Sequence, residues 1–120
     1  MTKANLKTLQ SLSVKCLTEG NLHKALKTIK LAIKTDKNSS LSYYILGRIH
    51  DELLQFNESI QSYKKYLTLD MNSPENEFHK KAKFNLSLAY FTIRDFEKGT
   101  QFYKNRHSQH SINLFKGKQE

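Results

Sequence analysis

The sequence is poor in the residues that cross-link a chain or break its regular structure. Its 120 residues include 1 cysteine, 1 proline, 4 glycines and no tryptophan. A lone Cys16 excludes an internal disulfide and a thiolate cage for zinc. No apolar run approaches the ~20 residues that span a bilayer, and the first residues lack the apolar core of a secretory signal. We therefore expect no membrane span and a reducing compartment such as the cytoplasm.

Acidic residues are also scarce. The chain has 20 Lys and Arg against 11 Asp and Glu, which gives a net charge of +9. Such a basic balance is compatible with an acidic protein, a nucleic acid or an anionic membrane surface, and it selects none of them. With 38% hydrophobic and 11% aromatic residues, the chain is too apolar to be disordered throughout. Its length predicts a single globular domain over residues 1–120.

The apolar residues indicate helices, and they recur. Because glycine, proline and alternating β-branched runs are rare, we interpret the chain as all-α. Residues 20–26 match residues 54–60 after a shift of 34, and a third copy follows 40 residues later. In each copy a leucine precedes a small residue in the first helix, and a small residue follows an apolar anchor by three positions in the second. These residues are Leu12-Ser13, Leu46-Gly47 and Leu86-Ser87, then Leu22 with Ala25, Phe56 with Ser59, and Phe96 with Gly99.

Six helices follow from this spacing. We expect them at about residues 4–19, 22–35, 40–53, 56–69, 74–93 and 95–106. Ser73 followed by Pro74 is a favourable helix start, so the fifth helix is predicted to begin early. The remaining residues, 107–120, form a short tail or capping turn.

The pattern resembles the tetratricopeptide repeat, a 34-residue helix-turn-helix, with copies at about 6–39, 40–73 and 74–106. The resemblance implies an all-α, right-handed superhelix of three repeats, in which small residues let paired helices approach closely. Leu54 and Arg94 depart from it, because they stand where the first turn has Gly20. Those two turns must therefore close without glycine.

The resemblance also implies a concave groove, lined by the first helix of each repeat, that receives a segment of a partner protein. The candidate groove residues are Val14, Leu17, Leu41, Tyr44, Ile45, Arg48, Lys81, Phe84, Asn85, Leu88 and Phe91, with Lys7, Gln10 and Asp51 on the same helices. Some of this lining could be ordinary core. Binding is favoured for Tyr44, Phe84 and Phe91, whereas Val14 and Ile45 fit both interpretations equally.

One subclass of the family binds the acidic tails of heat-shock chaperones through a carboxylate clamp. The clamp needs lysine, asparagine and arginine at set positions, and only Lys81 matches here. Gln10, Val14 and Ile45 stand at other clamp positions and cannot supply the charge-assisted hydrogen bonds. We therefore expect a protein outside this subclass.

No pattern indicates catalysis, a cofactor or a metal site. His107 and His110 lie in the tail without a carboxylate at ligand spacing. His50 occupies a packing position, whereas His23 and His79 lie near helix starts and are expected to face solvent. Cys16 has no histidine and acid arranged around it and is interpreted as a buried thiol. We expect a protein that is not an enzyme.

The expected function is that of an adaptor or assembly subunit that binds a hydrophobic or amphipathic protein segment in the groove. The alternative is a nucleic-acid-associated, ribonucleoprotein subunit. It would use the lysines Lys24, Lys27, Lys30 and Lys34, which share about a third of a helical wheel. The last repeat has no long capping helix after it, so either self-association through that end or docking of a partner there is also expected.

Overall fold

The computed structural model describes residues 3–71 and 76–106. Within these ranges the chain forms helices and no strands. The helices are α1 (Lys3–Thr18), α2 (Leu22–Thr35), α3 (Ser40–Glu52), α4 (Phe56–Leu69), α5 (Glu77–Thr92) and α6 (Phe96–Arg106). None of these six is long and apolar enough to cross a membrane. The prediction of an all-α chain with three helix pairs is confirmed, and the predicted tail at 107–120 lies outside the described residues.

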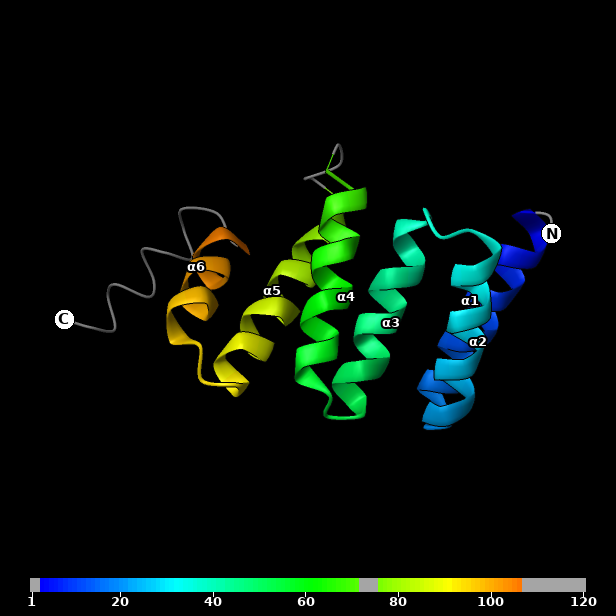
Figure 1. Cartoon of the computed structure of the whole chain (residues 1–120), viewed down its shortest axis with the longest axis horizontal. Helices are drawn as coiled ribbons and strands as arrows, with labels where there is room; N and C mark the ends of the chain where they lie inside the picture. The colour runs from blue at the N-terminus through cyan, green and yellow to red at the C-terminus, as the bar shows by residue number, and fades with distance from the viewer. Residues whose placement is uncertain (1–2, 72–75, 107–120) are drawn as a thin grey trace.

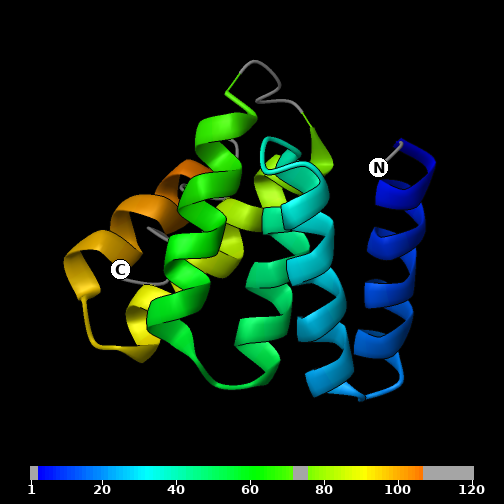
Figure 2. The same ribbon diagram turned by 45° about the vertical axis from the view of Figure 1, so that its right-hand side comes forward.

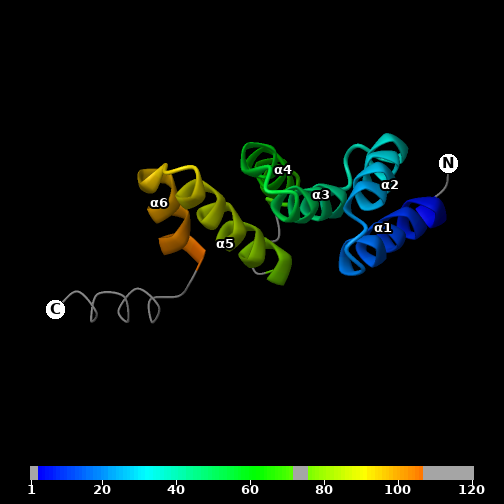
Figure 3. The ribbon, with the colours of Figure 1, turned by 90° about the horizontal axis from the view of Figure 1, so that it is seen from below.

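The helices alternate in direction and follow one another in a superhelical row (Figure 1). Each packs against its neighbours in the chain, as the turned view in Figure 2 also shows. In addition, α3 contacts both α1 and α5. Seen from below, α1, α3 and α5 lie along one side of the row, with α3 set back between the other two (Figure 3). The first helices of the three pairs thus form one continuous, concave layer.

Two apolar clusters hold the row together, and α3 belongs to both. Tyr44 is in the cluster that joins α3 to α4 and α5, and Phe102 of α6 packs against the same cluster. Its neighbour Ile45 is in the cluster formed with α1 and α2. Consecutive residues of a helix point about 100° apart, so one helix can serve two interfaces. Six of the 13 residues of α3 are buried as a result.

The small residues predicted at helix crossings lie where the paired helices touch. A Cβ atom on Gly47 would lie 2.7 Å from the ring of Tyr63 on α4, and one on Gly99 would lie 2.7 Å from the ring of Phe91 on α5. Ser13, Ser59 and Ser87, at the matching positions elsewhere, are fully buried. Their hydroxyl groups donate to backbone carbonyls, so burial leaves no unpaired donor.

The turn inside each pair has the same hydrogen-bond pattern, whatever residue stands at its left-handed position. In the first pair, the amide of Asn21 donates to the carbonyl of Cys16 at 2.8 Å, and Gly20 donates to Leu17 at 3.1 Å. This is a Schellman motif. The second and third pairs repeat both bonds, although Leu54 and Arg94 occupy the left-handed position with φ of 60° and 69°. These turns therefore close without glycine, as predicted, at a cost in backbone strain.

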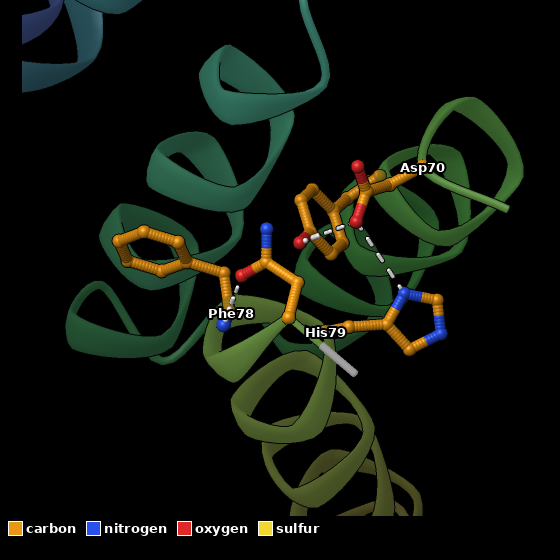
Figure 4. Close-up of polar contacts among 5 residues, drawn as sticks. Asp70, Phe78 and His79 are labelled. Atoms are coloured by element: carbon orange, nitrogen blue, oxygen red, sulfur yellow. Dashed lines mark hydrogen bonds and ion pairs between the residues drawn. The ribbon is translucent and has the colours of Figure 1, made fainter. Parts of the chain in front are cut away.

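The fifth helix begins later than predicted. We expected a start at Pro74 after a Ser73 cap; these two residues lie outside the described ranges, and α5 begins at Glu77. Asn76 caps it, and the side-chain oxygen of Asn76 accepts a hydrogen bond from the amide of Phe78 at 2.8 Å (Figure 4). This cap satisfies an otherwise free amide of the first turn, so the helix has no need of the earlier start.

The junction between the second and third pairs also buries His79, which we expected to face solvent. Its side chain is 8% exposed, and Nδ1 lies 3.5 Å from Oδ2 of Asp70 at the end of α4. The hydroxyl of Tyr66 donates to the same oxygen at 3.0 Å (Figure 4). The expectation was wrong because the start of α5 packs directly on the end of α4.

Candidate functional site

A pocket of about 490 Å³ opens between the second and third helix pairs. Its lining consists of Asp51 from α3, Phe56 from α4, and Asn85, Leu88, Ala89, Phe91 and Thr92 from α5. The five α5 residues fall on consecutive turns, at position 85, then 88 and 89, then 91 and 92, so they line one face of that helix. The pocket therefore lies on the α3–α5 side of the molecule, where the groove was predicted.

The apolar side of the pocket consists of side chains that the core leaves partly free. Leu88 is 45% exposed although it lies in the middle of α5. Phe91 is half-buried because its ring packs against Gly99 and lies 6.3 Å from the ring of Phe96. Phe56 is half-buried at the start of α4. Exposed apolar side chains that converge on a concave surface are typical of binding sites.

The polar side of the pocket is a chain of hydrogen bonds that crosses three helices. Asn85 Nδ2 on α5 donates to the hydroxyl of Tyr63 on α4 at 3.2 Å, and that hydroxyl donates to Oδ2 of Asp51 on α3 at 2.7 Å. The carboxylate can only accept, which fixes the direction of both bonds. Both bonds therefore run toward Asp51, and the side-chain carbonyl of Asn85 is left as an acceptor.

Asp51 is an incompletely compensated acid. Its second carboxylate oxygen, Oδ1, is buried and has no hydrogen-bond partner among the residues that the structure describes. Burial raises the pKa of the carboxyl group, and the hydrogen bond from Tyr63, the hydroxyl of Ser59 and the charge of Arg48 offset only part of this rise. The Tyr63 hydroxyl is buried beside this carboxylate, and both burial and the nearby charge raise its pKa. The pocket thus has an acceptor-rich polar end.

The structure divides the predicted groove residues into three groups. Exposed side chains are Val14, Arg48, Lys81 and Leu88, half-buried ones are Leu17, Leu41, Phe84, Asn85 and Phe91, and buried ones are Tyr44 and Ile45. Of these, Asn85, Leu88 and Phe91 meet at the pocket. The others lie elsewhere on α3 and α5 or on α1, outside the pocket lining.

Tyr44 and Ile45 need correction, because each is only 5% exposed. The ring of Tyr44 lies 5.1 Å from that of Phe78 and 5.6 Å from that of Tyr66, so aromatic neighbours cover it on α4 and α5. Gln10 is buried as well, and its amide donates to Ser42 and Ser39 at 2.9 and 3.0 Å. These three side chains hold adjacent helices together and do not line a free surface.

Sequence reasoning missed part of the site. Tyr63 stands four positions after Ser59 on the second helix of its repeat, and its hydroxyl turns out to be the centre of the polar chain. Thr92 and Phe56 complete the pocket at the ends of their helices. The signal for Phe56 was its role as the apolar anchor of the second repeat, which places it next to the end of α3.

Other chemistry-bearing residues are dispersed. Within the described part of the chain, no three His, Cys, Asp or Glu residues lie close enough to share a metal ion. Cys16 is a free, buried thiol. Lys24, Lys27, Lys30 and Lys34 are exposed on α2, away from the α3–α5 pocket.

Comparison with known proteins links this geometry to a family. A family model described as the tetratricopeptide repeat matches residues 41–72. The tetratricopeptide-repeat domain of Arabidopsis FLU is similar in structure, with a TM-score of 0.79 and 19% identity, over 87% of this chain and 92% of that chain. The Yersinia enterocolitica type III secretion translocator chaperone SycD gives a TM-score of 0.77 and 16% identity, over 96% and 86%.

More distant similarity extends to MamA from Desulfovibrio magneticus RS-1, with a TM-score of 0.53 and 21% identity over 85% of this chain and 73% of that chain. A search of curated proteins found no sequence match. The matched segment, 41–72, covers α3 and α4 almost completely. Residues 41–72 thus match the tetratricopeptide repeat in sequence, and the described helices share the fold of a tetratricopeptide-repeat domain.

Proposed function

We propose that this protein is a binding module that holds an apolar or amphipathic segment of a partner protein on the concave side of α3 and α5. One observation carries the proposal. The α3–α5 pocket places exposed Leu88 and half-buried Phe91 beside the hydrogen bonds that run from Asn85 through Tyr63 to Asp51. An apolar surface with a few ordered polar groups gives a partner both affinity and orientation. Exposure of Leu88 to solvent is unfavourable, whereas a bound partner segment would cover it.

The fold supports the same function. A stack of helix pairs presents a long concave surface without needing any catalytic group. The half-buried side chains of Leu41 and Phe84 lie further along the same two helices, α3 and α5. A partner segment that crosses both helices would bury this surface.

Affinity capture with the whole chain tests the proposal. Leu88→Asp puts a charge into the apolar side of the pocket and should reduce capture of the partner about tenfold or more. Leu31→Asp is the matched control, because Leu31 is 47% exposed on α2 and lies outside the pocket. It should leave capture unchanged. Circular dichroism must show both variants folded, and equal capture by wild type and Leu88→Asp would contradict the proposal.

The nucleic-acid alternative gains no support from the related structures. It makes the opposite prediction for the exposed lysines. Joint reversal of Lys24, Lys27 and Lys30 to Glu should leave capture intact if the partner binds at the pocket. Loss of capture in that variant, together with a steep dependence on salt, would favour binding of phosphates.

We also propose that the protein self-associates through its last helix pair and resides in a reducing compartment. Phe96 is 61% exposed at the start of α6, and this apolar end could pair with a second copy. Sedimentation at several concentrations tests the pairing, and a concentration-independent monomer would contradict it. A free, buried thiol at Cys16 is compatible with a reducing compartment such as the cytoplasm.

A further inference from the structure

We propose that the α3–α5 pocket selects one basic side chain, a lysine or an arginine, from the partner segment, and that Asp51 receives its cationic group. This inference rests on the proposed function and adds the chemistry of the ligand to it. The starting observation is that the polar end of the pocket offers acceptors to a ligand, while the Tyr63 hydroxyl proton and one N–H of Asn85 are already engaged. The Tyr63 hydroxyl donates to Asp51 Oδ2, and Asn85 Nδ2 donates to Tyr63.

The charge balance at this end of the pocket is unfinished. Asp51 Oδ1 is buried and lacks a hydrogen-bond partner among the described residues. Burying a carboxylate is unfavourable unless it is paired and fully hydrogen-bonded. A ligand that brings a positive charge and several N–H donors supplies what is missing. A neutral apolar ligand would leave the carboxylate more deeply buried and still unpaired.

The protein does not fill this place with a cation of its own. Arg48 lies one turn before Asp51 on α3, but its side chain is exposed, and no ion pair joins the two residues. Arg48 does not belong to the pocket lining either. Among the described residues Arg48 is close enough for its charge to lower the pKa of Asp51, but no lysine or arginine forms an ion pair with this carboxylate.

The apolar side of the pocket suits the stem of the same side chain. Lysine and arginine carry apolar stems that can lie along Leu88 while the charged head reaches the polar end. The rings of Phe56 and Phe91 also offer faces on which a cation can rest. A pocket of about 490 Å³ can hold one such side chain.

The charge of the whole molecule restricts the ligand further. A net charge of +9 repels a segment with many basic residues. Because only Asp51 is acidic in the pocket lining, we expect a single basic residue flanked by apolar ones. Selection thus combines the local attraction of one carboxylate with rejection of polybasic segments by the surface.

Selection from a displayed library of random peptides on the immobilised whole chain provides the test. Wild type should enrich peptides that carry one Lys or Arg at a fixed position among apolar residues. Asp51→Asn keeps the shape of the side chain and an acceptor for Tyr63, and it should enrich apolar peptides without the basic residue. Glu52→Gln is the matched control, because Glu52 is the exposed neighbouring acid outside the pocket. It should enrich the same peptides as wild type.

A selected peptide then gives a quantitative answer. Replacing its Lys by norleucine, or its Arg by citrulline, should weaken binding to wild type about tenfold and leave binding to Asp51→Asn unchanged. Equal affinities of the charged and neutral peptides for wild type would overturn the inference, and so would a charge preference that persists in Asp51→Asn.

The same experiment separates this inference from the proposed function. Leu88→Asp tests the apolar surface, so selected peptides of either kind should lose binding to that variant. If apolar peptides bind wild type and fail on Leu88→Asp, but show no preference for a basic residue, only the present inference is wrong. If selected peptides bind Leu88→Asp as well as wild type, the proposed function itself is wrong, and this inference fails with it.

Discussion

The hydroxyl of Tyr63 donates a hydrogen bond to Oδ2 of Asp51 at 2.7 Å, which ties α4 to α3 at the base of the pocket. The ring of the same tyrosine fills the space that Gly47 leaves open on α3. Tyr63 is fully buried, so its position is set by packing before any ligand arrives. One side chain thus connects the packing of the repeat with the polar end of the candidate site.

Removing this hydroxyl should be costly. Tyr63→Phe keeps the ring and leaves Asp51 without its donor and Asn85 without its acceptor, so we expect a loss of about 1–3 kcal/mol in the free energy of unfolding. Urea denaturation measures it. Tyr66→Phe is the matched control, because Tyr66 donates to Asp70, which lies at the end of its helix and also has His79 nearby. A loss no larger than that of the control would argue against a special role for the Tyr63 bond.

The carboxyl group of Asp51 should reduce stability at neutral pH. Burial raises its folded-state pKa above the ordinary 3.8, so the folded protein binds the proton more tightly than the unfolded chain. The stabilising contribution is present below pH 3.8 and is lost as pH rises through the folded-state pKa. Asp51→Asn should therefore melt at a higher temperature than wild type at neutral pH, and this advantage should disappear in acid.

Thermal unfolding of wild type and Asp51→Asn across this pH range gives the answer. A variant that is less stable than wild type at neutral pH would mean that the carboxylate is adequately paired inside the protein. A charge retained at a cost in stability is expected where it serves binding.

The close approach at Gly47 should not tolerate a side chain. The added methyl group of Gly47→Ala would lie 2.7 Å from the buried ring of Tyr63, so we expect a cost of about 1–3 kcal/mol in the free energy of unfolding. Ser87→Ala is the control, since position 87 already carries a Cβ atom and loses only the hydroxyl. Equal melting temperatures for Gly47→Ala and wild type would show that the helices can move apart freely.

Glycine should stabilise the two strained turns. Leu54 and Arg94 have φ of 60° and 69°, where a side chain costs more than glycine does. Leu54→Gly and Arg94→Gly should each gain about 0.5–1 kcal/mol, after allowance for the greater freedom of glycine in the unfolded chain. Gly20→Ala is the opposite control and should lose stability, because φ of Gly20 is 81°. Denaturant titrations that show losses for both glycine variants would contradict this.

The repeat pattern predicted the fold because it reflects a geometric need. Two helices can cross closely only where a small residue stands. Ser13, Gly47 and Ser87 occupy this position in the first helix of each repeat. The helix limits were predicted to within a few residues for the same reason. The start of α5 was the exception, since both Ser73 and Asn76 are good caps and the sequence does not rank them.

The candidate site was only partly predictable. A helical wheel shows which residues share a face, but it does not show how much of that face a neighbouring helix covers. Tyr44 is buried because Phe78 lies against it, and the position of Phe78 depends on the longer connection between the second and third repeats. The hydrogen bond from Tyr63 to Asp51 could not be predicted from the sequence either, because it depends on side-chain geometry between two helices.

Nuclear magnetic resonance mapping of a bound peptide tests the central claim most directly. A peptide selected on wild type should shift the backbone amide signals of Asp51, Asn85, Leu88 and Thr92, which border the pocket on α3 and α5. The amides of Lys24, Lys27 and Lys30 on α2 should stay unchanged. If the peptide instead shifts the α2 signals and leaves those of α3 and α5 in place, binding does not occur in the α3–α5 pocket and the account is wrong.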